Sequence, residues 1–263
     1  ALTGVTLSQL KNAPVLLTEK DALNPDTLKE IQRLNAKNIY ILGGEGVISK
    51  SIEDILSKNY KVIRVSGLDR YKTAVAVGQL VIKEKSIDTA IIVKGTDFPD
   101  TLSAAPFAAK GLIPILFTEP DKLSSDTIQA LQDWDIKNVI IVGGIGAVSS
   151  DVEQYIKNAM NISVKRVAGN DRYLTSLETA KFFSNNYKYS GVIIATGDAF
   201  PDALVGAAFA ANTTCPILLT GNNYISPDIL SYIKELKASS IHIIGGTGAV
   251  SDDIYNKLLS AVK

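Results

Sequence analysis

NVIIVGGIGAVS, residues 138–149, is the stretch that decides the fold, because the chain contains it three times. The other versions are NIYILGGEGVIS at 38–49 and SIHIIGGTGAVS at 240–251. Three further segments keep the same spacing, with offsets of 100 and then 102 residues: PVLLT at 14–18, PILFT at 114–118 and PILLT at 216–220. Self-similarity at a fixed period is the signature of a repeat architecture, so we interpret the chain as three copies of one unit.

Within one period, short apolar runs alternate with amphipathic segments. In the middle copy, strands are expected at 90–95, 114–118, 138–144 and 164–169, and helices at 100–109, 124–134, 149–160 and 171–183. Val- and Ile-rich strands that are apolar on both faces indicate parallel βαβ units covered by helices on both sides. We therefore expect an α/β fold of three tandem Rossmann-like βαβ units, with parallel sheets and right-handed crossovers.

The repeat also sets the expected units, which are residues 1–67, 68–168 and 169–263. Residues 1–4 align with residues 101–104, so the first copy lacks the strand and the helix that open the others. The third copy ends before its own version of the segment that closes the first two. We expect the sequence upstream of Ala1 to supply a further helix and strand and to end in Asp.

Composition excludes several classes of function. Lys+Arg and Asp+Glu are both 27 among 263 residues, whereas a nucleic-acid-binding protein normally carries a basic excess. A single cysteine, Cys215, rules out a disulfide within the chain, and a single histidine, His242, lies in an apolar run typical of a strand. The sequence has no catalytic triad, no metal-ligand spacing and no apolar stretch long enough to span a membrane. We therefore expect neither a cofactor nor a metal.

Each copy places a glycine-rich turn between a strand and a helix. The glycine pairs and the serines that close the turns are Gly43, Gly44 and Ser49, then Gly143, Gly144 and Ser149, then Gly245, Gly246 and Ser251. The pattern G-x-G-x-x-S is close to the dinucleotide fingerprint, but the acidic residue that a nucleotide site needs about 20 residues further on is missing. The favoured interpretation is a structural turn with the serines as N-caps, and a ligand-facing backbone is the alternative.

A second motif occurs twice, as RVSGLDRY at 64–71 and RVAGNDRY at 166–173. Asp69 and Asp171 stand where a helix is expected to begin, which favours N-capping. Arg70 and Arg172 follow inside the first turn, where a cation opposes the helix dipole unless it contacts a carboxylate or a ligand.

Two more arginines, Arg64 and Arg166, stand at the ends of the preceding strands. The expected internal partners of the four arginines are the aspartates of the motif itself, or Asp100 and Asp202 of the FPD segments. We also expect Asp100 and Asp202 to cap helices. Two interpretations of these arginines remain open. They form structural ion pairs at the junctions between units, or they contact a ligand directly.

Together, the PILLT segments, the GGxxAVS turns, RVxGxDRYxT and FPDAL resemble the type 2 cell-wall-binding repeats of clostridial proteins. The resemblance covers the three copies from Pro14 onward, with Val15 and Phe117 departing from the family's P-I-L-L pattern. It implies a pseudo-threefold arrangement of the repeats. It also implies a secreted, non-catalytic module that anchors a surface-layer or other cell wall protein of a Gram-positive bacterium. The implied partner is an anionic, teichoic-acid-like cell wall polysaccharide, neighbouring surface-layer proteins are further candidates, and any enzymatic activity belongs to another domain.

The resemblance also implies that the polymer contacts the P-I-L-L segments and the grooves between repeats. By position, the residues of these segments are Val15, Leu16, Leu17, Ile115, Leu116, Phe117, Ile217, Leu218 and Leu219. The repeated motif adds the candidate polymer contacts Arg64, Arg70, Tyr71, Arg166, Arg172 and Tyr173. Asp69, Asp171, Asp100 and Asp202 are expected to hold the junctions together.

Three copies of one unit suit a ligand that is itself a repeating chain, because weak sites on one rigid body gain avidity. Two other functions stay open at the level of sequence. One is an α/β enzyme or sensor that holds a nucleotide or sugar phosphate on the glycine turns. The other is a structural spacer that contacts only neighbouring proteins.

Overall fold

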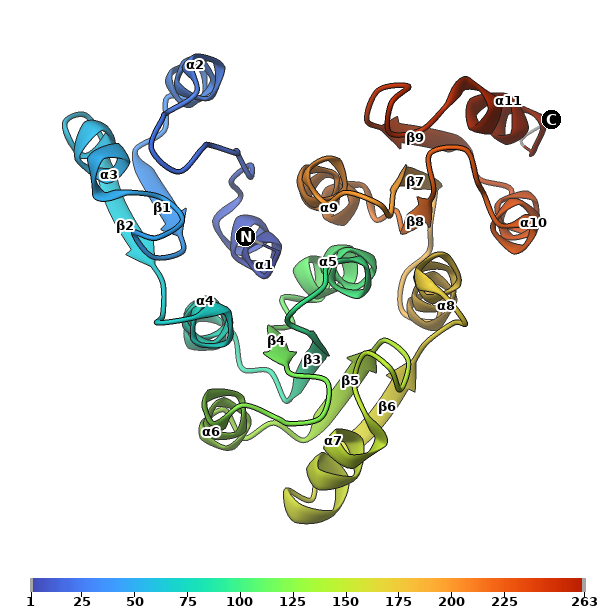
Figure 1. The fold of residues 1–263 in the computed structure, drawn as a ribbon, viewed down its shortest axis with the longest axis horizontal. Coiled ribbons are helices and arrows are strands. Elements are labelled where there is room, and N and C mark those ends of the chain that lie inside the picture. Colours follow the sequence, from blue (N-terminus) through green and yellow to red (C-terminus); the bar gives the residue numbers. More distant parts are fainter. Residues whose placement is uncertain (1, 262–263) are drawn as a thin grey trace.

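The structure, a computed structural model, describes residues 2–261 as three groups of parallel strands and helices (Figure 1). The strands are β1 (Asn38–Leu42), β2 (Lys61–Val65), β3 (Thr89–Lys94), β4 (Ile115–Thr118), β5 (Asn138–Val142), β6 (Ser163–Val167), β7 (Gly191–Thr196), β8 (Ile217–Thr220) and β9 (Ser240–Ile244). They pair in the orders β1-β2, β4-β3-β5-β6 and β8-β7-β9, and every pair is parallel. The predicted α/β fold of three repeated units is confirmed.

Helices connect and cover these sheets. They are α1 (Gly4–Lys11), α2 (Pro25–Arg33), α3 (Lys50–Ser57), α4 (Arg70–Glu84), α5 (Pro99–Gly111), α6 (Ser125–Asp133), α7 (Ser150–Gln154), α8 (Arg172–Ser184), α9 (Pro201–Thr213), α10 (Pro227–Leu236) and α11 (Asp252–Ala261). A π-helical turn, Tyr155–Ala159, continues α7. The strand–helix alternation that the hydrophobic pattern predicts for the middle copy is present from β3 to α8.

The cores of the second and third units surround their middle strands. Residues 90–93 of β3 and 192–195 of β7 are fully buried. Helices α4 and α6 pack against the second sheet and α8 and α9 against the third, while α5 contacts strands of both. Strands covered on both faces carry continuous Val and Ile runs, which is the pattern that the sequence shows.

Three helices, one from each unit, meet in the middle of the molecule (Figure 1). Helices α1, α5 and α9 contact one another there. The small residues Ala104, Ala108 and Ala207 are fully buried in this packing, and small side chains let helices approach closely. At the start of α5 and α9, the rings of Phe98 and Phe200 lie 5.9 Å apart. One helix per repeat around a common centre is the pseudo-threefold arrangement.

Two helices carry the chain from one unit into the next. Helix α4 follows β2, the last strand of the first sheet, and packs against β4 of the second sheet. Helix α8 follows β6 of the second sheet and packs against β8 of the third. The duplicated Asp-Arg-Tyr motif therefore marks the two junctions between consecutive units.

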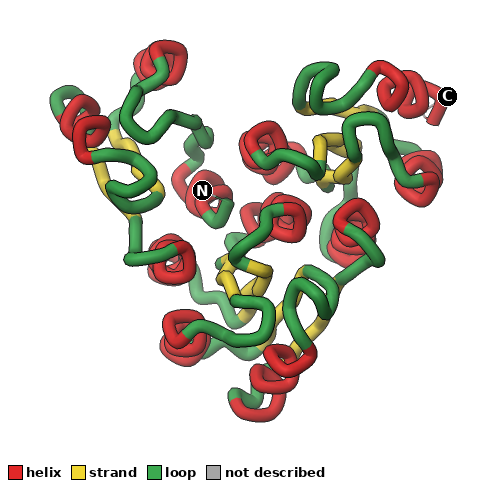
Figure 2. The backbone as a smooth tube through the Cα atoms, viewed as in Figure 1, coloured by secondary structure: helices red, strands yellow, loops and turns green. Residues whose placement is uncertain are grey.

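The segment at 14–18 differs from its two copies, which form β4 and β8. Residues 12–24 are loop throughout (Figure 2). Thr27 Oγ1 donates to the carbonyl oxygen of Leu17 at 2.8 Å, as Thr127 Oγ1 does to Phe117 at 2.8 Å, so one anchoring contact is kept. β4 and β8 pair with the middle strands β3 and β7, and the described part of the first sheet has no strand at that place.

Candidate functional site

The repeated motifs gather at one edge of each sheet. The glycine turns follow β1, β5 and β9, the FPD segments follow β3 and β7, and helices α4 and α8 begin just after β2 and β6. All these positions are carboxyl ends of parallel strands, which meet at the same edge of a sheet. Open α/β sheets bind their ligands at this edge, so we take it as the candidate binding face.

The glycine turns are closed by their own backbone hydrogen bonds. Gly43, Gly143 and Gly245 have φ values of 111°, 126° and 113°, a conformation that other residues rarely adopt. In the second turn, the amides of Ala147 and Val148 donate to the carbonyl oxygen of Gly144 at 2.9 and 3.0 Å. The first and third turns make the equivalent bonds. Because these amides are used internally, the geometry favours a structural turn over a nucleotide-binding loop.

The serines that close the turns have different roles. Ser149 is an N-cap, since its Oγ accepts a hydrogen bond from the amide of Val152 at 3.3 Å, as predicted. The side chain of Ser49 makes no capping bond and pairs with Ser51 Oγ at 2.8 Å. Ser251 Oγ is buried and has no hydrogen-bond partner within residues 2–261. Ser49 thus occupies the N-cap position of α3, as predicted, but without a side-chain capping bond, and no capping bond supports the prediction at Ser251.

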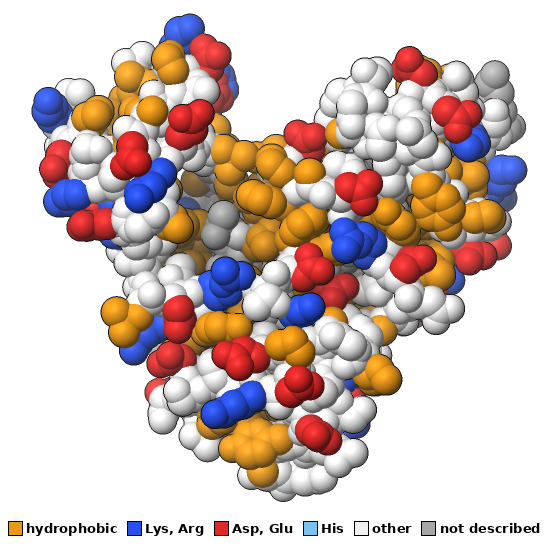
Figure 3. Space-filling model, viewed as in Figure 1, with side chains coloured by type: hydrophobic (Ala, Val, Ile, Leu, Met, Phe, Trp, Pro, Cys, Tyr) orange, Lys and Arg blue, Asp and Glu red, His pale blue; other side chains and the backbone are white. Residues whose placement is uncertain are grey.

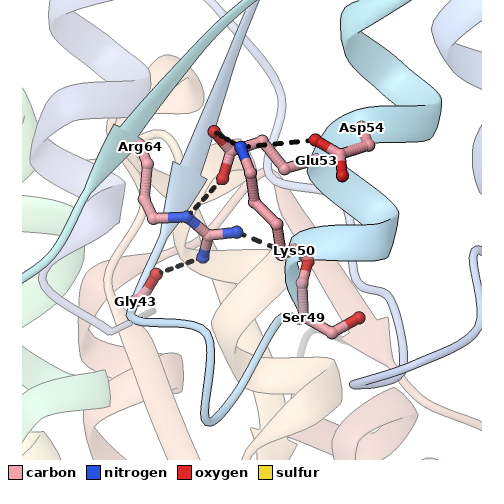
Figure 4. Close-up of polar contacts among 6 residues, drawn as sticks. All are labelled: Gly43, Ser49, Lys50, Glu53, Asp54 and Arg64. Carbon is pink, nitrogen blue, oxygen red and sulfur yellow. Dashed lines mark hydrogen bonds and ion pairs between the residues drawn. The ribbon is translucent and has the colours of Figure 1, made fainter.

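Arg64 forms an internal clasp that joins β2 to the first glycine turn and to α3 (Figure 4). Its Nε donates to Glu53 at 2.7 Å, and its two other nitrogens donate to the carbonyl oxygens of Gly43 at 2.7 Å and Ser49 at 3.4 Å. The guanidinium lowers the pKa of the Glu53 carboxyl chiefly through this hydrogen bond, and Lys50 adds to the effect.

Arg166 repeats the clasp in the second unit. It donates to Glu153 at 2.8 Å and to the carbonyl oxygens of Gly143 and Ser149 at 2.8 and 3.3 Å. The side chains of Arg166 and Glu153 are only 16% and 19% exposed. Lys157 and then Arg166 lower the pKa of Glu153 by donating hydrogen bonds to it. The prediction that aspartates pair with Arg64 and Arg166 is wrong, because both arginines reach a glutamate on the helix that follows the glycine turn.

The Asp-Arg-Tyr residues lie where helices α4 and α8 begin. Asp69 and Asp171 accept hydrogen bonds from the amides of Lys72 and Leu174 at 2.8 and 2.7 Å, which confirms both N-caps. One nitrogen of Arg70 donates to the carbonyl oxygen of Gly95, and one of Arg172 donates to that of Gly197, both at 2.7 Å.

These bonds hold each arginine at the carboxyl end of the middle strand in the next sheet. The partner is a backbone carbonyl at both junctions, so the expected pairing of Arg70 and Arg172 with an aspartate is wrong. Arg70 is exposed and Arg172 is half-buried. Each side chain therefore combines an internal anchor with access to solvent on the candidate face.

Asp100 and Asp202 lie in the first turns of α5 and α9, but neither is the N-cap, which is Phe98 or Phe200. A Cβ atom added to Gly143 would lie 2.5 Å from Asp100 Oδ2, and one added to Gly245 would lie 2.7 Å from Asp202 Oδ2. The predicted capping role is therefore wrong, because each carboxylate packs against the glycine turn beside it. Burial raises the pKa of Asp100 to about 6, with Asp97 adding to the increase and Arg172 and Lys94 opposing it.

Most of the P-I-L-L residues lie in the core. Ile115, Leu116, Ile217, Leu218 and Leu219 are at most 1% exposed, and Phe117 is 8% exposed. A polymer on the surface has no access to these strand side chains, so burial contradicts direct contact through them. In the first unit, Leu16 and Leu17 are 37% and 39% exposed, because that segment is loop, and Val15 is half-buried.

Sequence reasoning missed the glutamates that hold Arg64 and Arg166. A signal for them is present in the repeats, since Glu53 and Glu153 stand at the same aligned position. The third copy, which has no such arginine within the chain, has Tyr255 there instead. The glutamate is present in the two copies that have the arginine and is replaced in the copy that lacks it. This correlation across the copies would have identified the ion pair from the sequence.

The face of the molecule drawn in Figure 3 has no region dominated by charges of one sign. Side chains of both signs lie among hydrophobic patches on the face drawn in Figure 3. Among residues 2–261, no group of three His, Cys, Asp or Glu side chains is placed to hold a metal ion. Within the same residues, no helix is long and apolar enough to cross a membrane.

Comparison with known proteins identifies the family. The model of cell wall binding domain 2 matches residues 1–53, 64–153 and 166–255. The chain is 41% identical over 202 residues to the N-acetylmuramoyl-L-alanine amidase LytC of Bacillus subtilis, covering 77% of the chain and 40% of LytC. It is 34% identical over 260 residues to the amidase enhancer of the same organism, covering 98% of the chain and 35% of that protein.

Two solved structures share the fold. Cwp8 from Clostridium difficile has a TM-score of 0.85 and 31% identity, over 99% of this chain and 45% of that one. Cwp6 from the same organism has a TM-score of 0.85 and 26% identity, over 98% and 41%. The chain thus spans less than half the length of each of these relatives. With all three repeats matched and the whole fold shared, this chain is a cell-wall-binding module of the cell wall binding domain 2 family.

Proposed function

We propose that this chain anchors a longer protein non-covalently to the cell wall by binding an anionic wall polysaccharide along the carboxyl edges of its sheets. The observation that carries the proposal is the duplicated arginine of the two junctions. Arg70 and Arg172 are each fixed by a 2.7 Å bond to a strand-end glycine, and they lie at equivalent places on consecutive units. A polymer with regularly spaced negative groups can engage both at once.

The repetition strengthens a weak contact. Arginine binds phosphate and carboxylate groups through several donors, but a single exposed pair contributes little free energy. Two or more such contacts on one rigid body raise the effective concentration of each after the first has formed. The chain has no net charge to attract an anion from a distance, so the binding should rest on these local arginines.

The same arrangement suggests where other functions reside. We propose that catalytic activity, where the parent protein has one, belongs to a different part of that protein, since each relative is more than twice as long as the matched chain. A more specific proposal is that the parent protein is attached within a surface layer, beside other surface proteins. Under either proposal, this module binds the wall and positions the parent protein there.

Cosedimentation with purified cell walls tests the proposal. The chain should bind native walls and should fail to bind walls from which hydrofluoric acid has removed the phosphodiester-linked polymer. Equal binding to both wall preparations would contradict an anionic polymer as the ligand.

Substitution of the junction arginines tests the site itself. The double variant Arg70→Ala, Arg172→Ala should lower the affinity for native walls about tenfold or more, because two linked contacts are lost. Arg33→Ala is the matched control, since Arg33 is exposed and its ion-pair partner within residues 2–261 is Glu30 on the same helix, α2. If the double variant lowers the melting temperature but binds walls like the wild type, these arginines are structural and the chain acts as a spacer.

A further inference from the structure

A cluster of two tyrosines and an aspartate lies at the carboxyl edge of the third sheet. The rings of Tyr173, in the first turn of α8, and Tyr224, in the loop after β8, have centroids 5.4 Å apart and planes at 57°. Tyr173 Oη donates to Asp198 Oδ1 at 3.1 Å. Tyr224 is 48% exposed, and Asp198, in the loop after β7, is also exposed. We call these three residues the tyrosine cluster.

The backbone beneath the tyrosine cluster is fixed by hydrogen bonds. Gly221 donates to the carbonyl oxygen of Tyr224 at 2.9 Å, which closes the loop that carries this tyrosine. Asn222 Nδ2 donates to the carbonyl oxygens of Thr247 and Gly248 at 3.2 and 2.8 Å, which ties the same loop to the third glycine turn. The loop that carries the exposed ring is therefore already ordered, so ligand binding loses little conformational entropy in this loop.

Two glycines bring the backbone close to the rings. A Cβ atom added to Gly197 would lie 3.2 Å from Tyr173 Cε1, and one added to Gly221 would lie 3.2 Å from Tyr173 Oη and 3.4 Å from Tyr224 Cβ. Burial and the Asp198 carboxylate raise the pKa of Tyr173, so its hydroxyl stays protonated and donates. The cluster thus presents an aromatic face beside a hydroxyl and a carboxylate.

The second unit has different side chains at the same aligned positions. Lys122 stands in place of Tyr224, Thr96 in place of Asp198 and Glu119 in place of Gly221. Lys94 stands where the third unit has Thr196. The edge of the second sheet is therefore ionic, while the edge of the third is aromatic, although both keep the arginine and the tyrosine of the duplicated motif.

We infer that the tyrosine cluster is a subsite for an uncharged pyranose ring of the wall polysaccharide. The inference rests on the proposed function and names what the third unit contributes to it. A pyranose ring has an apolar face of C–H groups that packs on an exposed aromatic ring, and hydroxyls at its rim that donate to a carboxylate. Tyr224 supplies the aromatic surface, and Asp198, already held by Tyr173, supplies the acceptor.

A structural role explains the tyrosine cluster less well. Tyr189, in the same unit, is a structural tyrosine: it is 8% exposed and its hydroxyl donates to the carbonyl oxygen of Ala180 at 2.7 Å. Tyr224 instead leaves about half of its side chain in water. The cluster combines an exposed aromatic surface with a fixed hydroxyl and a carboxylate, which is the combination of apolar area and placed polar groups that ligand sites use.

Salt dependence of wall binding separates this aromatic subsite from the ionic contacts. Binding of the chain to purified walls is measured at about 50 and about 500 mM NaCl, since salt screens exposed charges but not ring stacking. Tyr224→Ala should weaken binding about two- to tenfold at both salt concentrations, and Tyr224→Phe, which keeps the ring, should bind like the wild type. Arg70→Ala, which removes one of the proposed ionic contacts, should weaken binding mainly at low salt.

Tyr255→Ala is the matched control, because Tyr255 is exposed to a similar extent, at 49%, on α11 of the same unit and is not part of the tyrosine cluster. Circular dichroism verifies that each variant is folded. Unchanged binding of Tyr224→Ala at both salt concentrations, or an equal loss for Tyr224→Phe, would overturn the subsite while leaving the wall-anchoring function intact. Failure of the wild-type chain to distinguish native from stripped walls would instead overturn the proposed function.

Discussion

At the scale of single residues, the repeat places the same residue types in different environments. Asp100 and Asp202 both press a carboxylate against a glycine with positive φ. Asp100 also has Asp97 nearby, whereas the third unit has Ala199 at that aligned position. Burial and the second carboxylate raise the pKa of Asp100 to about 6, from an ordinary value of 3.8.

This raised pKa predicts that the contribution of Asp100 to stability falls as the pH rises. Between pH 3.8 and about 6 the folded chain holds a proton on Asp100 that the unfolded chain has lost, so this residue's contribution to the free energy of unfolding decreases through the window. Above pH 6 the ionised carboxyl costs the fold on the order of 2–3 kcal/mol. Asp100→Asn should therefore raise the melting temperature at pH 7.5 and flatten the profile between pH 4 and 6.5. Asp133→Asn, at an exposed position on α6, is the control, and an unchanged profile for Asp100→Asn would refute the assignment.

At the scale of secondary-structure elements, the arginine clasp connects three neighbours in each of the first two units. Arg166 on β6 holds the turn after β5 through two carbonyl oxygens and holds α7 through Glu153. Its removal would leave Glu153, which is 19% exposed, with Lys157 as its remaining partner. The clasp thus fixes the position of the turn at the candidate binding face.

Loss of the clasp should destabilise the chain without any role for a ligand. Arg166→Ala should lower the free energy of unfolding in urea by about 1–3 kcal/mol, because partly buried charge-assisted hydrogen bonds are broken. Arg33→Ala, which removes an exposed pair on α2, should leave the free energy of unfolding nearly unchanged, because solvent screens that pair. Equal effects of the two substitutions would show that the clasp does not stabilise the turn.

The elements themselves were mostly predictable from the sequence, and their contacts were not. Hydrophobic runs and turn residues are local signals, so β3 to α8 lie where the pattern places them. No local signal marks residues 14–18 as a loop, since their sequence differs from the β8 segment only by Val15 in place of Ile217. Whether such a segment forms a strand depends on a neighbouring strand with which it can pair. The partners of Arg64 and Arg166 also depend on tertiary geometry. Glu53 and Glu153 come within reach only after strand and helix have packed together.

At the scale of the whole molecule, the three units share a central apolar cluster in addition to the cores of their own sheets. A single cluster of buried apolar residues includes Val5 of α1, Ala105 of α5 and Ala207 of α9, so each unit contributes to the packing of the others. Shared packing predicts that the units unfold together, because loss of one removes buried contacts from its neighbours. A rigid assembly is also what the proposed avidity requires, since linked sites gain affinity only when their geometry is held.

The single tryptophan provides a direct test of this coupling. Trp134 lies in the second unit, where its indole nitrogen donates to Gln79 at 2.9 Å, so its fluorescence reports unfolding there. Ala207→Leu overpacks the centre from the third unit and should cost about 1–3 kcal/mol. The Trp134 transition in urea should shift to lower concentration together with the circular dichroism of the whole chain. Leu259→Ala, an exposed change in the same unit, should leave both transitions in place. A circular dichroism transition that shifts while the Trp134 transition stays fixed would mean that the units unfold independently. The rigid geometry on which the proposed avidity depends would then lack support.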